Sequence, residues 1–139
     1  MAFWKKPQEV PDWLAGVAFF EGFTADELTR VAALSTELEV KQGVMLIDQG
    51  DAGLDCFVIV DGIANVYISA EHVATVGAGS MLGEMALVGH RPRTASVVAE
   101  TDMKLLRFDA AHFRKLLTEM PKAEERVVSL LMARRKMND

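Results

Sequence analysis

The spacing of apolar residues along the chain changes at about residue 38 and again at about residue 108. Before residue 38, residues 13–20 are rich in Trp, Leu, Val and Phe, and Thr24 and Glu27 are spaced as a helix capping box. The apolar residues that follow, such as Leu28 and Val31, fall on one face of a helix. Residues 1–37 are therefore predicted to form an N-terminal helical segment.

Residues 38–108 instead contain short runs of apolar, β-branched residues separated by glycine and aspartate, which is typical of strands joined by turns. The candidate strands are 44–47, 56–60, 63–68, 73–76, 95–99 and 103–108. The Asp61-Gly62 pair predicts a two-residue hairpin, because these residue types suit the positive φ angles of a type I′ turn. Many short strands at this spacing predict a barrel, a roll or a sandwich.

Helical spacing returns in residues 109–139. Asp109 is suited to cap a first helix, and Pro121 is suited to the first turn of a second. One face of the second helix carries three apolar residues and a cation: Val127, Leu130, Leu131 and Arg134. The prediction is a single domain, 1–139, with helices on both sides of a β core.

The composition is that of one soluble globular domain, with 139 residues, 50% of them hydrophobic and 25% charged. The net charge is −5 and no basic block is present, which argues against direct binding to nucleic acid. The chain contains neither an apolar run long enough for a membrane span nor a signal peptide, so we expect a cytoplasmic protein. Cys56 lies in an apolar run, where a buried structural role is expected.

The sequence contains no arrangement typical of a catalytic centre. A metal-dependent enzyme built on a roll needs several histidines and a carboxylate around one ion. His72, His90 and His112 are far apart and form no H-x-H pair, and no zinc spacing or Gly-Lys phosphate loop is present. We expect neither enzymatic activity nor a bound metal.

Residues 82–97 interrupt the strand pattern and carry the candidate chemistry. Gly83 lets the backbone approach another group closely, and residues 84–87 can form one helical turn whose amides bind an anion. Arg93 can present a planar fork to two phosphate oxygens, and the Glu84 carboxylate can accept a hydroxyl. These residues are suited to a ligand with both an anionic group and a hydroxyl, such as a sugar phosphate. In the alternative interpretation, Glu84 and Arg93 only pair with each other across a loop.

The same stretch resembles the phosphate-binding cassette of the cyclic nucleotide-binding domain family, whose pattern is F-G-E-hydrophobic-A-L, a short loop, and P-R-A/S/T-A-S/T-V. The matching positions are Gly83, Glu84, Ala86, Leu87, Pro92, Arg93, Thr94, Ala95, Ser96 and Val97, and Leu82 stands where an aromatic residue is usual. Residues 23–28, 50–53 and 57–62 also resemble the family's opening helix, G-D-x-G turn and following strand. The resemblance extends from about residue 17 to the C-terminus.

The resemblance implies an eight-stranded β-roll of the jelly-roll type with N-terminal helices, a short cassette helix and C-terminal lid helices. It implies that Arg93 binds the cyclic phosphate and that Glu84 binds the ribose 2′-hydroxyl. The backbone of Gly83, Ala86 and Thr94 would complete the shell around the phosphate and the ribose. The other predicted ligand contacts are Leu82, Met85, Ala95, Ile68, Ala74 and Arg134.

The identity of the base is left open by the sequence. Thr94 resembles the hydroxyl residue of cGMP-responsive members, but a threonine can also bond the phosphate in cAMP binders, and our prediction is cAMP. Ile68 and Ala74, on strands flanking a predicted turn at Glu71-His72, are candidate apolar walls for the base.

The last helix has two interpretations. In the family this helix closes as a lid over the base, and Arg134 would then stack on the purine. Alternatively, Leu130 and Leu131 form a homodimer interface. The predicted function is a sensor of cAMP, or of cGMP, that signals to a separate protein effector. The remaining alternative is a scaffold or dimerisation module that keeps the fold and binds no nucleotide.

Overall fold

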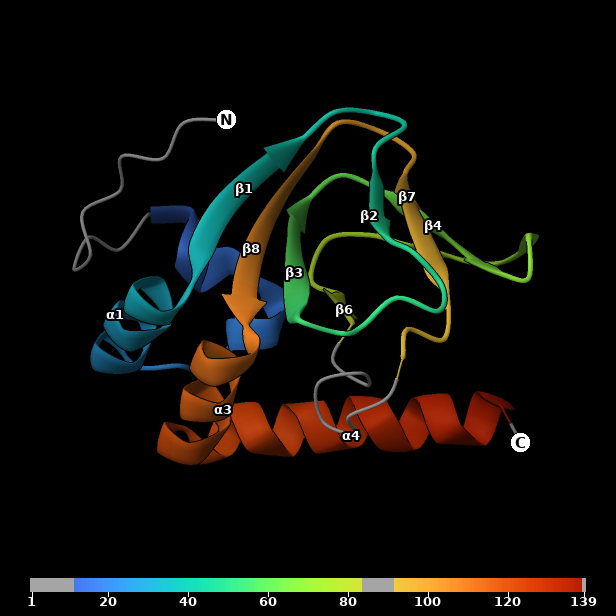
Figure 1. The fold of residues 1–139 in the computed structure, drawn as a ribbon. Coiled ribbons are helices and arrows are strands. Elements are labelled where there is room, and N and C mark those ends of the chain that lie inside the picture. The colour runs from blue at the N-terminus through green and yellow to red at the C-terminus, as the bar shows by residue number, and fades with distance from the viewer. Residues whose placement is uncertain (1–11, 84–91, 139) are drawn as a thin grey trace.

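The computed structural model describes residues 12–83 and 92–138 (Figure 1). In chain order, the elements within these residues are η1 (Asp12–Gly16), η2 (Ala18–Phe20), α1 (Ala25–Leu34), β1 (Thr36–Val40), β2 (Met45–Ile47), β3 (Asp55–Asp61), β4 (Ala64–Ile68), β5 (Glu71–Val76), β6 (Met81–Leu82), β7 (Ser96–Ala99), β8 (Met103–Asp109), α3 (Ala110–Glu119) and α4 (Pro121–Asn138). Both η elements are 3-10 helices, so the apolar residues 13–20 form short 3-10 turns.

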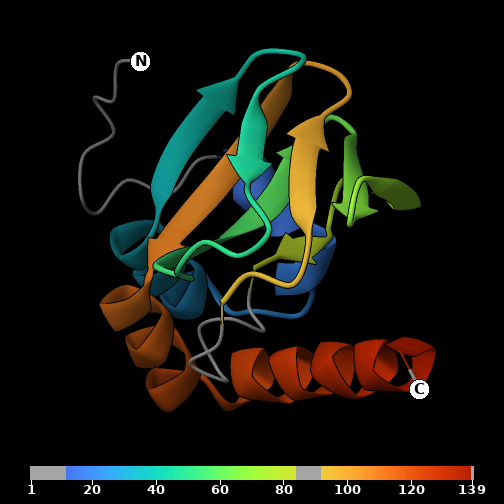
Figure 2. The ribbon, with the colours of Figure 1, turned by 45° about the vertical axis from the view of Figure 1, so that its right-hand side comes forward.

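The strands of the described residues form two four-stranded antiparallel sheets that close into a roll (Figures 1 and 2). The first sheet has the order β1-β8-β3-β6, and the second has the order β2-β7-β4-β5. The 3-10 helices, α1 and α3 cover one side of the first sheet, and α4 runs along one end of the roll. This arrangement confirms the predicted eight-stranded β-roll with flanking helices.

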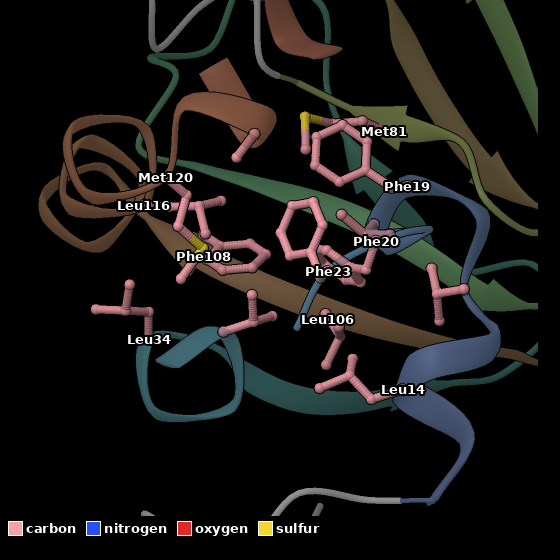
Figure 3. Close-up of a cluster of buried hydrophobic side chains, with 14 of the residues drawn as sticks. Leu14, Phe19, Phe20, Phe23, Leu34, Met81, Leu106, Phe108, Leu116 and Met120 are labelled. Atoms are coloured by element: carbon pink, nitrogen blue, oxygen red, sulfur yellow. The ribbon is translucent and has the colours of Figure 1, made fainter. Parts of the chain in front are cut away.

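Side chains of the central strands β3 and β8 alternate between two buried clusters, because successive residues of a strand point to opposite faces. The helical core lies between the first sheet and the helices (Figure 3), and its members from these two strands are Cys56, Val58, Leu106 and Phe108. The roll core lies between the two sheets and includes Phe57, Ile59, Met103 and Leu105. Cys56 is fully buried, as its apolar neighbours predict.

The predicted helix starts are confirmed. The Thr24 hydroxyl accepts a hydrogen bond from the Glu27 backbone amide at 3.1 Å, and the Glu27 carboxylate accepts one from the Thr24 amide at 2.8 Å. At the start of α3, the Asp109 carboxylate accepts a hydrogen bond from the His112 amide at 2.8 Å. Pro121 is the first residue of α4.

The hairpin predicted at Asp61-Gly62 is wrong. Strands β3 and β4 belong to different sheets, and of the two residues only Gly62 has a positive φ, at +104°. The chain crosses here between the sheets, beside the segment that crosses back after β7. Ile63 joins the two crossings, because its carbonyl accepts from the Glu100 amide at 2.9 Å and its amide donates to the Thr101 hydroxyl at 3.0 Å. A dipeptide signal carries no information about this long-range contact.

The turn predicted at Glu71-His72 is also wrong, because both residues lie in β5. The hairpin between β4 and β5 turns at Ser69 and Ala70, which have φ angles of 51° and 68°. Serine and alanine are not the residues that type I′ turns prefer, so the sequence contains no strong signal for this turn.

Two strands are missing from the predicted set. The first strand, β1, begins at Thr36, two residues before the expected boundary, and alternates charged residues with Leu38 and Val40. The two residues of β6, Met81 and Leu82, are both buried and pair with β3. Strand β1 was not predicted because it has few apolar residues, and β6 was not predicted because it is short.

Replacing Gly62 by alanine is expected to destabilise the fold. A Cβ at this position would lie 2.6 Å from the Asp102 carbonyl oxygen and 2.8 Å from the Met103 Cγ, and its φ disfavours any residue with a side chain. We expect the free energy of unfolding to fall by about 1 to 3 kcal/mol, measured by urea denaturation. Gly77→Ala is the matched control, since its Cβ would come no closer than 3.8 Å to another residue. Equal losses in the two variants would contradict this explanation.

Candidate ligand-binding site

Arg93 is the only buried charged residue in the part of the chain that the structure describes, with 7% of its surface exposed. Its Nη1 donates to the Gly83 carbonyl at 2.9 Å. Its Nη2 donates to the Asp55 carbonyl at 2.6 Å and to the Asp55 Oδ1 at 2.9 Å. These contacts with described residues engage three of the five N–H groups of the guanidinium. A buried charge is costly unless it is paired, so Asp55 is what stabilises Arg93 in this position.

Gly83 is the residue against which the Arg93 guanidinium packs. It has a φ of +86°, and a Cβ here would lie 2.4 Å from the Arg93 Nη1 and 3.2 Å from the Asp55 carbonyl oxygen. The sequence predicts a close approach to the Gly83 backbone, and the structure identifies the approaching group as the guanidinium of Arg93.

The backbone of Arg93 is held by the turn at residues 50–53. The Gly50 amide donates to the Arg93 carbonyl at 2.9 Å, and the Arg93 amide donates to the Asp51 carbonyl at 2.8 Å. Ala52 forms an isolated antiparallel bridge with Pro92. The turn that resembles the family's G-D-x-G segment therefore positions the arginine from which the site is built.

Asp55 links Arg93 to a second arginine on β8. Its Oδ2 accepts a hydrogen bond from the Arg107 Nε at 2.7 Å, while its Oδ1 contacts Arg93. We call these three residues the Arg-Asp-Arg cluster. The exposed fractions of their side chains are 6% for Arg93, 23% for Asp55 and 37% for Arg107. Asp55 and Arg107 were not predicted from the sequence, although each is a charged residue in an otherwise largely apolar strand.

The other predicted ligand contacts among the described residues lie at the end of β6, in the segment before β7 and on the β4–β5 hairpin. Leu82 is buried in the roll core at the end of β6, directly before Gly83. Thr94 is exposed and Ala95 is half-buried, in the segment between Arg93 and β7.

Ile68 and Ala74 lie on the hairpin formed by β4 and β5, where they are 38% exposed and half-buried respectively. The end of this hairpin is tied to the segment before Gly50, because the Ser69 amide donates to the Gln49 Oε1 at 2.8 Å. The hairpin end and the turn that holds Arg93 are therefore neighbours.

Four predicted residues are not placed by the structure. Glu84, Met85 and Ala86 lie outside the described residues, as does the side chain of Arg134. Their roles stay predictions.

Helix α4 lies along the end of the roll at which β6 ends and β7 begins (Figures 1 and 2). Its first half is bonded to the N-terminal helices. The Arg126 guanidinium donates to the Phe19 carbonyl and lies 5.0 Å from the centroid of the Phe23 ring. The Lys122 ammonium lies 2.8 Å from a carboxylate oxygen of Glu27. These contacts join the first half of α4 to η2 and α1.

The apolar face predicted for the last helix packs on the chain's own helical core. Val127 is buried, and Leu130 and Leu131 are half-buried against the same cluster. Within the described residues, no helix is long and apolar enough to cross a membrane. In the same part of the chain, no group of three or more His, Cys, Asp or Glu side chains is arranged to hold a metal ion.

The sequence matches a known protein family. The sequence profile of the cyclic nucleotide-binding domain matches residues 37–120. The chain belongs to the cyclic nucleotide-binding domain family. The resemblance predicted from the cassette is therefore confirmed, and the family is one of regulatory domains rather than enzymes.

Relatives of this cyclic nucleotide-binding domain occur in larger proteins. The chain is 35% identical over 101 residues to the cAMP-dependent protein kinase type II regulatory subunit of Drosophila melanogaster, which covers 73% of this chain and 27% of that protein. It is 30% identical over 128 residues to a cyclic nucleotide-gated potassium channel of Rhizobium etli, which covers 91% of this chain and 36% of that protein. The chain thus spans about a third or less of the length of these relatives.

The fold is shared with a solved activator protein. The structure superimposes on the Thermus thermophilus catabolite activator protein with a TM-score of 0.79 and 24% sequence identity, covering 88% of this chain and 60% of that one. At this level of identity the likeness shows the β-roll fold.

The stability of the domain is expected to depend on pH through Asp109. Its pKa is lowered by the hydrogen bond from the His112 backbone amide, then by the His112 side chain, and less strongly by the charge of Arg107. A group whose pKa is lowered by folding stabilises the fold above its unfolded pKa, and the contribution is lost as the pH falls through the folded pKa.

We therefore expect the free energy of unfolding of the wild type to fall more between about pH 6 and about pH 3 than that of Asp109→Asn. The asparagine amide oxygen can still cap α3 but does not titrate. Urea denaturation at the two pH values measures both falls, and parallel falls would contradict the role given to Asp109.

Proposed function

We propose that this domain is a cAMP sensor whose cyclic phosphate binds at Arg93. The observation that carries the proposal is the placement of Arg93. Its side chain is buried, its backbone is hydrogen-bonded to the turn at residues 50–53, and its guanidinium packs against Gly83. A cyclic phosphodiester offers two oxygens and one negative charge, which suit the planar fork of an arginine. Family membership supports the ligand class, and the name of the Drosophila relative supports cAMP as the nucleotide.

The remaining contacts are proposed from the motif. Glu84 accepts the ribose 2′-hydroxyl, and the backbone of Gly83, Ala86 and Thr94 completes the shell around the phosphate and ribose. The link between Ser69 and Gln49 supports a position of the β4–β5 hairpin near this shell. Further proposed contacts are Leu82, Met85, Ala95, Ile68, Ala74 and Arg134.

The proposed response is a movement of α4 that signals to a protein effector. A ligand that makes contacts only when the helix is closed shifts the population toward the closed state. The first half of α4 is bonded to the N-terminal helices through Arg126 and Lys122. Leu130 and Leu131 also pack against the helical core, so we propose that the end of the helix beyond Leu131 closes over the base with Arg134. The kinase subunit and the channel among the relatives illustrate the kinds of output that such a domain controls.

Arg93→Ala is expected to weaken binding of cAMP by at least about 30-fold, equivalent to about 2 kcal/mol, because the phosphate charge would be left unpaired. Calorimetric titration with cAMP and then cGMP measures the loss, and the wild type is expected to bind cAMP more tightly. Arg30→Ala is the matched control, since Arg30 forms an exposed ion pair with Glu119 at 2.7 Å and its loss changes the net charge equally. An unchanged titration of Arg93→Ala would overturn the site, and a wild type that binds neither nucleotide would favour the scaffold alternative.

Hydrogen exchange of α4 is expected to slow when cAMP is added. The backbone amides in the second half of residues 121–137 become protected if the helix closes over the ligand. Exchange measured by mass spectrometry with and without saturating nucleotide tests this, and Arg93→Ala is the negative control. Equal protection in both states would contradict closure of the helix while leaving nucleotide binding intact.

A further inference from the structure

Arg107 lies beside Asp55 because of the register between β3 and β8. In this antiparallel ladder Asp55 is opposite Asp109, and Phe57 is opposite Arg107. Residues that lie opposite each other, or two positions apart on one strand, share a face of the sheet. Asp55 and Arg107 are therefore diagonal neighbours on the face that points into the roll.

The position of Arg107 breaks the apolar pattern of β8. The preceding inward-facing residues, Met103 and Leu105, are buried in the roll core. The next inward position holds a half-buried arginine, at the end of the roll where Arg93 and Gly83 lie. The Arg107 Nε is 2.7 Å from the Asp55 Oδ2. A charge at a position that the strand period marks as apolar is a departure typical of functional sites.

Asp55 has opposing effects on an anion that approaches Arg93. Its carboxylate stabilises the buried guanidinium, but it also competes with a phosphate for the same N–H groups and repels the phosphate charge. If Arg93 were its sole partner, a phosphate that took over the guanidinium would leave a largely buried carboxylate unpaired. Such an unpaired charge is costly.

Arg107 removes this conflict, because each carboxylate oxygen of Asp55 has its own guanidinium. Oδ2 remains paired with Arg107 when Oδ1 gives up part of its contact with Arg93. We propose that Arg107 is a positioning residue for phosphate binding, which holds Asp55 so that Arg93 can bind the cyclic phosphate. This inference rests on the proposed function, and it assigns to Arg107 no direct contact with the ligand.

The test is a double-mutant cycle on the affinity for cAMP, measured by calorimetric titration with Arg107→Gln, Asp55→Asn and the double variant. Arg107→Gln is expected to weaken binding by about tenfold, which lies within the range of coupling between contacting residues. In the Asp55→Asn background the same substitution is expected to change the affinity by less than about twofold, because no carboxylate remains to be held. Asparagine keeps an oxygen acceptor for the Arg93 Nη2.

Two further variants separate this role from general effects. Arg30→Gln removes the same charge from an exposed ion pair between α1 and α3, and it is expected to leave the affinity within about twofold. Arg107→Lys keeps the charge at the site and is expected to retain more affinity than Arg107→Gln. It also tests the proposal without any change at Asp55.

The outcomes are distinct. A wild type that binds cAMP, together with equal losses from Arg107→Gln in both backgrounds, would overturn the positioning role and leave the proposed function standing. The same conclusion would follow if the wild type bound cAMP and Arg107→Gln bound it equally tightly. A wild type that binds no cyclic nucleotide would overturn both. Loss of affinity only where Asp55 is present would establish the role, since a merely structural defect would persist in the double variant.

Discussion

The pairing of a buried guanidinium with one carboxylate is the constraint on which the site depends. Arg93 can remain buried only because Asp55 neutralises it and two backbone carbonyls accept its N–H groups. That requirement brings together the start of β3, the end of β6 and the segment before β7. Gly83 belongs to the same constraint, since a side chain there would occupy the space of the guanidinium.

The strands that hold this cluster are packed on both faces. Strands β3 and β8 lie at the centre of the first sheet, with the helical core on one face and the roll core on the other. Asp55 begins the inward face of β3, and Arg107 follows Leu105, the last apolar residue on the inward face of β8. The backbone of both residues is thus held in well-packed strands, while the Asp55 carboxylate and the Arg107 guanidinium lie at the end of the roll. A preorganised geometry of this kind reduces the entropy lost when a ligand binds.

The same end of the roll is bordered by α4, which gives the site a connection to the rest of the chain (Figure 2). Arg126 and Lys122 bond this helix to the segment around Phe19 and to Glu27. These contacts anchor the first half of α4 to the N-terminal helices.

Local sequence determined the elements whose causes are local. The capping box at Thr24, the cap at Asp109, the start of α4 at Pro121 and the cassette motif around Arg93 all depend on residues a few positions apart. Tertiary structure decided the features that arise from contacts between distant segments. Asp61-Gly62 became a crossing between sheets rather than a hairpin, because the next residue, Ile63, is hydrogen-bonded to the distant Glu100 and Thr101.

The partners of Arg93 show the same division most clearly. Its motif was readable in the sequence, but its contacts with Asp55 and, through Asp55, with Arg107 depend on the register of β3 against β8. Single charged residues in apolar strands carry no local signal for such a pairing. The sequence thus identified the arginine of the motif, and only the fold decided which charges hold it, because burial and strand register exist only in the folded chain.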